Sequence, residues 1–411
     1  MATATGQRRR VARKGATARP VDSLEQFDHV EYMSQHGHEE VATWLDRETG
    51  LRAIIAIHDT TLGPGLGGTR LRRYDSSAEA LLDVLRLSEG MTYKAAVAGL
   101  PLGGAKAVIL ADGKEERDPA LRAARFRAFG RFVESLGGRY ITAEDVGTAP
   151  QDMTEIRTQT QHVAGIPREA GGSGDPSPST AYGVVCGMRA LIEEGLGRSS
   201  LDGVRVAVQG LGHVGMSLTE QLLRDHGATV IAADVRPAIV EEARKRFAGE
   251  KRFSLVTADE IHKQECDVFS PCAFGAGINP VTIPQLRCRI VAGAANNQLA
   301  DEDRDAALLC ERGILYAVDY VINAGGLIHV MSELEAKGGW SEEDAARVKA
   351  KAAGIYDTLK RLLTLSREEG ISPHAAARQM AAERIQAARR GKAQPSESKR
   401  KAAKNSKASA K

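Results

Sequence analysis

The sequence is poor in aromatic residues, which make up 4% of its 411 residues. A core must therefore be built mainly from Ala, Val, Leu and Ile, and the hydrophobic total of 42% is ordinary for a globular protein. No apolar run approaches the roughly 18–20 residues that cross a bilayer, and no apolar stretch follows the basic N-terminus. We therefore expect neither a membrane span nor a secretory signal. The length predicts two domains, and no internal repeat is present.

Cysteine is also scarce, which bears on the redox environment. The five cysteines are odd in number and scattered, and none forms a CxxC pair. This pattern predicts neither a disulfide framework nor a zinc site, and we expect no metal. We interpret the cysteines as reduced, mostly buried thiols of a cytoplasmic protein. They are Cys186, Cys266, Cys272, Cys288 and Cys310.

The net charge of +3 conceals two basic ends. Residues 1–20 and residues 391–411 each carry +6, which leaves −9 for the body between them. Both ends lack an apolar period and are rich in Ala, Ser, Lys and Arg, so each is predicted to be disordered. Such ends could contact nucleic acid through phosphates, but we favour solvating tails without a dedicated partner.

Residues 21–150 predict a first domain of mixed α/β structure, completed by helices from about 330 to 390. The segments DHVEYM and EEVATWLDRETGLRAIIAIHDT are interpreted as strands, with a turn at residues 48–50. Helices are predicted to begin at Ser76-Ser77 and at Asp118-Pro119. Further strands are expected in AKAVIL and in RYITAEDVGT, which runs into a loop.

Residues 180–325 predict a Rossmann-type, doubly wound domain. A Gly- and Pro-rich loop precedes it, and a helix from Thr180 to about Gly195 leads into alternating strands and helices. Strands that each end in a loop are expected in CDVFSPCA, RIVAGAAN and GILYAVDYVINAGG. This alternation indicates a parallel sheet. The chain from Ser341 to Arg390 is predicted to be helical.

A dinucleotide-binding motif lies in the second domain. Gly210, Gly212 and Gly215 form G-x-G-x-x-G after an apolar strand and before a helix, and Asp234 ends the next strand. These are the conditions that the motif requires, because the pyrophosphate binds at the helix N-terminus and the acid binds ribose hydroxyls. Asp234 would repel a 2′-phosphate, which favours NAD over NADP, although Arg236 weakens that preference. The alternative is a glycine-rich turn without a ligand.

Two lysines stand in the apolar, glycine-rich segment GMTYKAAVAGLPLGGAKAVIL. Lys94 follows an aromatic residue, and Lys106 is expected to close a glycine turn at residues 103–105. Burial lowers the pKa of an ammonium toward the range in which it acts as a base. A single lysine here would be interpreted as a side chain with a buried aliphatic part and a solvated ammonium group. Two lysines in one such segment favour a substrate or catalytic site. Asp145, at the end of a predicted strand, would complete chemistry on a carbon that bears an amine.

At this point the motifs resemble a known family. The segments LGPGLGGTRLRRY, GMTYKAAVAGLPLGGAKAV, RYITAEDVGT, GSGDPSPSTAYGV, VQGLGHVG, DVFSPCA, AGAANNQLAD and YVINAGG are similar to those of glutamate/leucine/phenylalanine/valine dehydrogenases, in collinear order from about residue 25 to 390. The resemblance implies that Lys106 is the catalytic lysine, that Asp145 moves protons and that Lys94 pairs with the substrate carboxylate. We assign the remaining substrate-binding positions to Leu66, Gly67, Ala143, Asn296, Leu327 and Val330. The cofactor-binding positions are assigned to Thr180, Gly210, Leu211, Gly212, His213, Val214, Gly215, Met216, Asp234, Ala273 and Asn296.

The resemblance also implies the reaction, which is NAD-dependent, reversible oxidative deamination of an L-amino acid to a 2-oxo acid and ammonium by a homo-oligomer. Lys106, neutral through burial, would activate water, while Lys94 would stay charged. Glutamate-specific relatives have a lysine where this chain has Leu66, so an apolar substrate is favoured. Ala143 and Val330 resemble leucine-type enzymes, whereas GGWSEEDAARVKA looks closer to the phenylalanine type, and both alternatives stay open. A nucleic-acid-associated protein acting through its basic ends is a more remote alternative.

Overall fold

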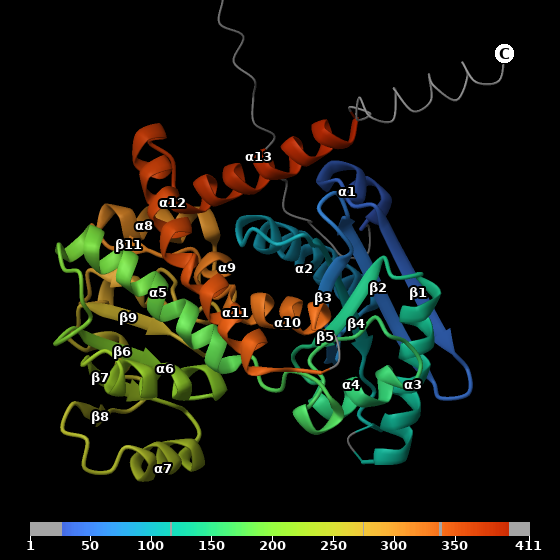
Figure 1. The fold of residues 1–411 in the computed structure, drawn as a ribbon, viewed down its shortest axis with the longest axis horizontal. Helices are drawn as coiled ribbons and strands as arrows, with labels where there is room; N and C mark the ends of the chain where they lie inside the picture. The colour runs from blue at the N-terminus through green and yellow to red at the C-terminus, as the bar shows by residue number, and fades with distance from the viewer. Residues whose placement is uncertain (1–26, 116, 274, 337–338, 394–411) are drawn as a thin grey trace, which may run out of the picture.

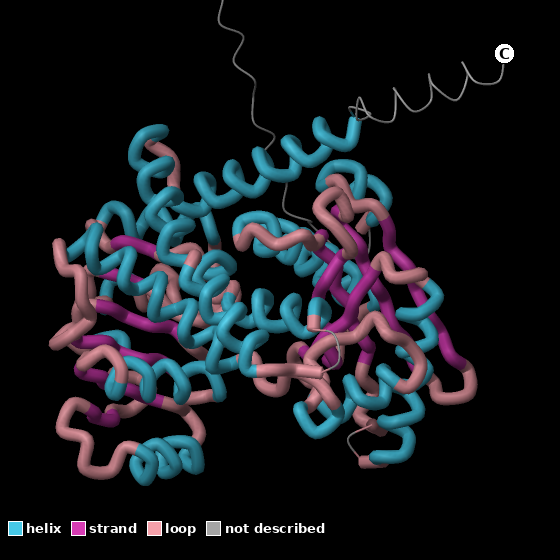
Figure 2. Tube along the Cα trace, in the orientation of Figure 1, coloured by secondary structure: helices cyan, strands magenta, loops and turns pink. Residues whose placement is uncertain are grey.

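The computed structural model describes residues 27–115, 117–273, 275–336 and 339–393, which form two β-sheets with helices around them (Figures 1 and 2). The predicted basic arm at residues 1–20 lies outside the described residues, as do residues 394–411. Residues 391–393 continue the last helix, so the predicted start of a disordered tail at residue 391 is wrong. Lys392 and Ala393 are good helix formers, and the first proline after them is Pro395.

The first half of the chain forms a five-stranded mixed sheet in the order β1-β2-β4-β3-β5. The neighbours of β2 run antiparallel to it, whereas β3 runs parallel to both β4 and β5. The strands are β1 (Glu40–Asp46), β2 (Leu51–Asp59), β3 (Gly65–Arg72), β4 (Gly103–Leu110) and β5 (Tyr140–Glu144). Because β3 lies between β4 and β5, side chains of these three strands meet on each face of the sheet.

Helices cover both faces of this sheet. On one face, α2 (Ser77–Val97) packs Val84 and Leu85 against Val108. On the other face, α3 (Pro119–Ser135) and α4 (Pro150–Arg157) supply a second cluster that includes Phe129 and Met153. The predicted starts of α2 and α3 are confirmed, because Ser76 and Asp118 accept hydrogen bonds from the first backbone N–H groups of their helices.

The first described helix corrects a prediction. The segment DHVEYM, interpreted as a strand, lies in α1 (His29–His36). Asp28 accepts hydrogen bonds from the N–H groups of Val30 and Glu31, and Gly37 ends the helix in the left-handed conformation with φ 82°. An N-cap aspartate and a C-terminal glycine are helix boundary signals, and here they prevail over the short apolar alternation.

The second half forms a six-stranded parallel sheet in the order β11-β10-β9-β6-β7-β8. Read from β8, this is the 3-2-1-4-5-6 order of dinucleotide-binding folds, so the predicted fold class is confirmed. The strands are β6 (Arg205–Gln209), β7 (Thr229–Ala233), β8 (Phe253–Leu255), β9 (Val268–Pro271), β10 (Ile290–Val291) and β11 (Leu315–Tyr316). The helices along this half are α5 (Ser177–Leu196), α6 (His213–Arg224), α7 (Pro237–Arg246), α8 (Glu302–Glu311), α9 (Asp319–Ile322), α10 (Gly325–Glu335), α11 (Glu342–Ala353), α12 (Ile355–Glu369) and α13 (Pro373–Ala393).

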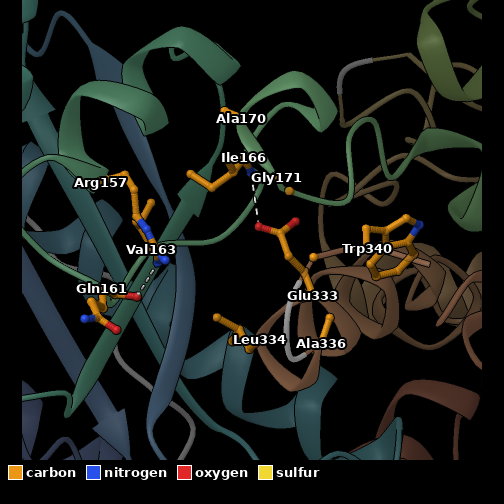
Figure 3. Close-up of a pocket in the computed structure, with 12 residues that line it drawn as sticks. Arg157, Gln161, Val163, Ile166, Ala170, Gly171, Glu333, Leu334, Ala336 and Trp340 are labelled. Carbon is orange, nitrogen blue, oxygen red and sulfur yellow. Dashed lines mark hydrogen bonds between the residues drawn. The ribbon is translucent and has the colours of Figure 1, made fainter.

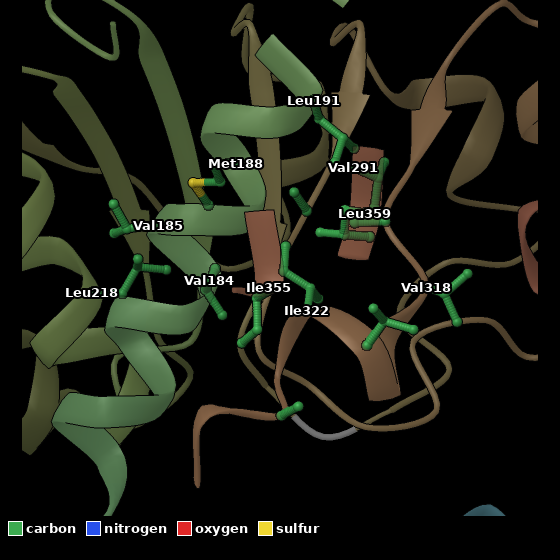
Figure 4. Close-up of a cluster of buried hydrophobic side chains, with 14 of the residues drawn as sticks. Val184, Val185, Met188, Leu191, Leu218, Val291, Val318, Ile322, Ile355 and Leu359 are labelled. Atoms are coloured by element: carbon green, nitrogen blue, oxygen red, sulfur yellow. The ribbon is translucent and has the colours of Figure 1, made fainter. Parts of the chain in front are cut away.

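Two details of this half differ from the sequence prediction. The segment after β11 was expected to be a loop, but it forms α9 and the start of α10. Gly325 and Gly326 let α10 begin directly against α5, because a Cβ at either position would collide with residues 179–180 of α5. The helices after residue 330 also divide between the two halves. α10, α11 and α12 pack on α5, whereas α13 packs on α2. Figure 4 shows the part of this contact in which Ile355 and Leu359 of α12 lie against α5.

Helix α13 crosses from the second half of the molecule to the first (Figure 1). Near its start, His374 and Arg378 contact Glu302 of α8. Further along, Arg384 donates hydrogen bonds to the carbonyls of Ala95 and Ala96 in the last turn of α2 and of Leu100 in the loop that follows. In the part of the chain described, no helix has the length and hydropathy to cross a membrane.

Candidate functional site

Lys106 and Asp145, which lie far apart in the sequence, come together in the structure. Lys106 projects from β4 and Asp145 follows β5, and the Lys106 Nζ atom lies 3.1 Å from Asp145 Oδ1. Lys106 is 5% exposed. A buried ammonium and carboxylate at this distance can exchange a proton directly. The glycine turn expected before Lys106 is instead the first part of β4.

A second cation holds the other oxygen of Asp145. Arg70, on β3, places its Nε atom 3.0 Å from Asp145 Oδ2, and its Nη1 atom lies 3.1 Å from Asp83 Oδ2 of α2. Burial raises the pKa of Asp145, but the charges and hydrogen bonds of Lys106 and Arg70 outweigh burial and lower it below its ordinary value. Sequence reasoning missed Arg70, although it lies inside the quoted segment LGPGLGGTRLRRY.

Helix α2 brings Lys94 to the same face of the sheet. A Cβ on Gly104 would collide with the backbone N and the hydroxyl of Thr92, so the missing side chain allows α2 to lie directly on β4. Thr92 is two residues before Lys94, and Gly104 is two residues before Lys106. Glycine is therefore required here for close helix–strand contact, and that contact brings the two lysines together.

Burial lowers the pKa of Lys94, although Lys94 is the lysine that was expected to stay charged. Lys94 is half-buried. Its pKa is lowered from 10.5 to about 8, chiefly by desolvation and also by the nearby charge of Lys106, while Asp319 and Asp145 act in the opposite direction. At neutral pH Lys94 is still mostly protonated. Asp319 begins α9 in the second half of the chain, and it was not among the predicted site residues.

The predicted apolar positions of the site are buried and belong to one hydrophobic cluster. Leu66 comes from β3, Ala143 from β5, and Leu327 and Val330 from α10. Of these, Leu66 and Ala143 form an apolar wall on the face of the sheet that carries Lys106, since Leu66 pairs with Gly104 and Ala143 pairs with Gly68. Gly67 has a packing reason of its own, because a Cβ there would collide with the Ala105 carbonyl of β4.

The glycine loop has the geometry that a dinucleotide requires. Gly210 has φ 95°, and a Cβ on it would lie 2.8 Å from the backbone N of Ala273. A Cβ on Gly215 would collide with the Gly210 carbonyl, whereas at Gly212, the N-cap of α6, the nearest atom is the flexible end of Arg236 at 3.8 Å. The three glycines thus supply the tight turn, the helix–strand contact and the open approach to the helix N-terminus. The residues Leu211, His213, Val214 and Met216 complete this turn, with Leu211 and Met216 buried and His213 exposed.

Asp234 follows β7 and lies against the glycine loop. Its Oδ2 atom accepts a hydrogen bond from the Leu211 N–H at 2.8 Å, and the Arg236 guanidinium binds both of its oxygens at 2.9 Å. Burial raises the pKa of Asp234, but the hydrogen bonds of Arg236 and Leu211 lower it to about 2. Asp234 is therefore an anion with a cation beside it, where a ribose would bind.

Two further predicted residues lie in the second half of the chain, one in α5 and one after β10. Thr180, in the first turn of α5, donates to the Pro176 carbonyl at 3.1 Å, and a Cβ on Gly326 would lie 2.6 Å from its hydroxyl. Asn296 is exposed, and its Oδ1 atom accepts a hydrogen bond from Asn323 Nδ2 at 2.7 Å. Asn323 was missed, since it lies in a segment expected to be a loop.

A cavity of about 360 Å³ opens next to the C-terminal end of α10 (Figure 3). None of the predicted site residues lines it. Glu333 lies at its edge and accepts hydrogen bonds from the N–H groups of Gly165, Ile166 and Ser173 at 3.0, 3.2 and 3.1 Å. These contacts anchor α10, which carries Leu327 and Val330, to the segment that joins the two halves. The lining residues are Arg157, Gln161, Val163, Ile166, Ala170, Gly171, Gly172, Glu333, Leu334, Ala336, Gly339 and Trp340. Among the described residues, no group of three His, Cys, Asp or Glu side chains is placed to hold a metal ion.

Comparison with known proteins identifies the family of the chain. Residues 38–162 match the family model of the Glu/Leu/Phe/Val dehydrogenase dimerisation domain, and residues 171–392 match that of the Glutamate/Leucine/Phenylalanine/Valine dehydrogenases. Leucine dehydrogenase of Bacillus cereus is 48% identical over 355 residues, which cover 86% of this chain and 93% of that protein. Phenylalanine dehydrogenase of Caldalkalibacillus thermarum is 46% identical over 85% of this chain and 91% of its own. The crystal structure of L-tryptophan dehydrogenase from Nostoc punctiforme matches with a TM-score of 0.74 and 42% identity, covering 88% of this chain and 99% of that one.

Proposed function

Because the chain belongs to the glutamate/leucine/phenylalanine/valine dehydrogenase family, we propose that it oxidises a branched-chain L-amino acid with NAD to the 2-oxo acid and ammonium. It is an amino-acid dehydrogenase by family. The observation that supports the specific reaction is the 3.1 Å pair of Lys106 and Asp145, next to Lys94 and a buried apolar wall.

In the proposed reaction Lys94 binds the α-carboxylate of the substrate. Its ammonium lies between the two halves of the molecule, and a bound carboxylate would supply a counter-charge to a group that burial penalises. This contact fixes the Cα atom with respect to Lys106, so positioning contributes to the rate. A bound nicotinamide would supply the hydride acceptor.

Lys106 and Asp145 carry the protons of the reaction. After the Cα–H bond of the amino acid is oxidised, the substrate is an imine, which water must attack. Neutral Lys106 accepts a proton from that water, and Asp145 relays protons to the departing nitrogen, which leaves as ammonium. Before it can accept this proton, Lys106 must lose its own proton to Asp145 or to solvent. The 3.1 Å contact between Lys106 Nζ and Asp145 Oδ1 provides a route for that transfer.

The substrate side chain is assigned from the wall beside the lysines. Leu66 is 3% exposed and lies on the strand that carries Arg70. An acidic side chain would lose its hydration there without gaining a partner, which is costly. The identities to leucine and phenylalanine dehydrogenases are similar, at 48% and 46%. Ala143 and Val330 favour a branched aliphatic side chain, and phenylalanine is the alternative.

We propose NAD as the cofactor because Asp234 stands where a ribose 2′-hydroxyl would be bound. Its carboxylate can accept hydrogen bonds from hydroxyl groups and repels a 2′-phosphate. Thr180, Ala273 and Asn296 are proposed to contact the nicotinamide end. We also propose a homo-oligomer formed through the first half of the chain, since residues 38–162 match a dimerisation-domain model. No contact of the described residues supports nucleic-acid binding, which was the less favoured alternative for the basic ends, and of those ends the structure describes residues 391–393 alone.

The test is a panel of L-amino acids assayed with NAD and with NADP. We expect the highest kcat/KM with leucine, isoleucine or valine and NAD, and no turnover of glutamate. Preference for phenylalanine would assign the alternative substrate class. Absence of turnover with every apolar amino acid would contradict the proposal.

A further inference from the structure

We propose that Arg70 is a positioning residue of the deamination site, which holds one oxygen of Asp145 so that the other faces Lys106. The inference rests on the proposed function, because it assigns a role within the same lysine–aspartate pair. Arg70 is argued to act through Asp145, without contact to the substrate.

The register of the sheet brings Arg70 to Asp145. Thr69 of β3 pairs with Glu144 of β5, so the next residue of each strand, Arg70 and Asp145, lie opposite each other. Arg70 Nε is 3.0 Å from Oδ2 of the aspartate, and Lys106 Nζ is 3.1 Å from Oδ1. Rotation of the carboxylate would therefore break both contacts. Gly68 makes room for this arrangement, since a Cβ on it would lie 2.9 Å from the Asp145 Cβ.

Arg70 is itself held in place from a second side. Its Nη1 atom donates to Asp83 of α2 at 3.1 Å, and Asp83 also accepts the Tyr74 hydroxyl at 2.7 Å. The guanidinium thus bridges the end of β5 and the helix that carries Lys94. A planar guanidinium can donate in two directions at once, whereas a lysine is a single point of charge. The bridge therefore links the geometry of the proton-transfer pair to that of the carboxylate-binding helix.

Arg70 also determines the charge state of the carboxylate. Burial opposes ionisation of Asp145, and the two cations that touch it favour ionisation. Removal of Arg70 leaves Lys106 as the one contacting cation in the described structure, so the pKa of Asp145 should rise. The other titratable groups that interact with Asp145 are Lys94 of α2 and Tyr140 and Glu144 of β5.

The experiment compares Arg70→Met with Arg72→Met. Arg72 lies two residues further along β3, is largely exposed, and pairs with Glu79 at 3.6 Å. With the preferred amino acid and NAD, Arg70→Met should lower kcat by about 10- to 100-fold. It should also move the acidic limb of the kcat/KM profile to higher pH by about one pH unit. Arg72→Met should change neither. Arg70→Lys should restore the position of the acidic limb, because the positive charge is kept. It should restore only part of kcat, because an ammonium group cannot donate to Asp145 and Asp83 with the geometry of a planar guanidinium.

A purely structural role would give a different pattern. If Arg70→Met lowered the unfolding temperature and kcat but left the acidic limb in place, the proposal would be overturned. A second readout does not depend on turnover, namely the change in unfolding free energy for Arg70→Met measured with and without Asp145→Asn. We expect the two substitutions to be non-additive, and additivity would contradict the proposal. If the wild-type protein turned over no apolar amino acid, the proposed function would fail, while this thermodynamic cycle would still test whether Arg70 and Asp145 are energetically coupled.

Discussion

Carboxylate binding should weaken as the pH rises through about 8, because Lys94 loses its charge there. The pKa of Lys94 is lowered from 10.5 to about 8, chiefly by burial, and this net shift corresponds to roughly 3 kcal/mol at about 1.4 kcal/mol per pH unit. The protonated lysine carries this penalty in the empty site, and a bound carboxylate offsets part of it. Substrate binding and Lys94 protonation are therefore expected to be coupled.

The assay should use a ligand that titrates nowhere near this pH. 4-Methylpentanoate has the carbon skeleton of leucine without the amino group, so its own charge is constant from about pH 6 to 10. Its inhibition constant against leucine, at saturating NAD, should be flat below pH 8 and then rise about tenfold per pH unit. Asp319→Asn removes a negative charge that supports Lys94, so the break should move to lower pH by about one pH unit. Asp259→Asn, an exposed acidic residue, is the matched control.

Two results would refute this reasoning. One is an inhibition constant that shows no break between about pH 7 and 9, and the other is a break that Asp319→Asn leaves in place. The stability of the ligand-free protein gives an independent check of sign. The folded pKa of Lys94 lies below its unfolded value, so its neutral form favours folding. This contribution should therefore increase stability as the pH rises from about 8 toward 10.5, and Lys94→Met should abolish the increase.

Three further predictions concern catalysis, cofactor choice and stability. Lys106→Met should lower kcat by at least about 10²-fold while 4-methylpentanoate still binds, as competition and single-turnover assays would show; retained turnover would remove Lys106 from the mechanism. Asp234→Ala should remove about 1.5–3 kcal/mol of hydrogen bonding to the ribose and leave Arg236 free to bind a 2′-phosphate. The ratio of kcat/KM for NADP to kcat/KM for NAD should therefore rise at least about tenfold. An unchanged ratio would argue against the contact between Asp234 and the ribose. Arg384→Ala removes side-chain hydrogen bonds to the carbonyls of Ala95, Ala96 and Leu100, of which Ala95 and Ala96 keep backbone donors. Denaturant unfolding should therefore show a loss of about 1–3 kcal/mol, whereas the exposed Arg390→Ala should have little effect.

The residues that could be predicted from sequence lie in short local patterns. The glycine loop, with a strand before it and Asp234 at the end of the next strand, indicates a dinucleotide fold without reference to the rest of the chain. Lys94 and Lys106 were identified because charged residues are unusual in an apolar, glycine-rich segment, and Asp145 was identified because it ends a predicted strand beside Gly147 and Thr148. The alternation of strands and helices likewise predicted the parallel sheet, and the observed strand order confirms it.

The residues that were missed depend on pairing between distant segments. Arg70 is followed by Arg72 and Arg73, so in the sequence it looks like part of a solvated strand end. Its partner Asp145 lies 75 positions away and is reached only through the register of β3 and β5. Asp319 was hidden in a similar way, because its segment was interpreted as a strand and a loop, whereas it begins α9 beside the helix that carries Lys94.

Close backbone packing, as much as polar side chains, positions the charges of this site. Gly104 lets α2 lie on β4, and Gly68 lets Asp145 lie across β3, since in each case a Cβ would collide with the group that now occupies the space. Two ammonium groups brought together this way repel, so a carboxylate must lie near each of them. Asp145 contacts Lys106, and Asp319 supports Lys94 from the other half of the chain. The charge on Lys94 therefore depends on how the two halves sit against each other, which links any movement between them to the strength of carboxylate binding.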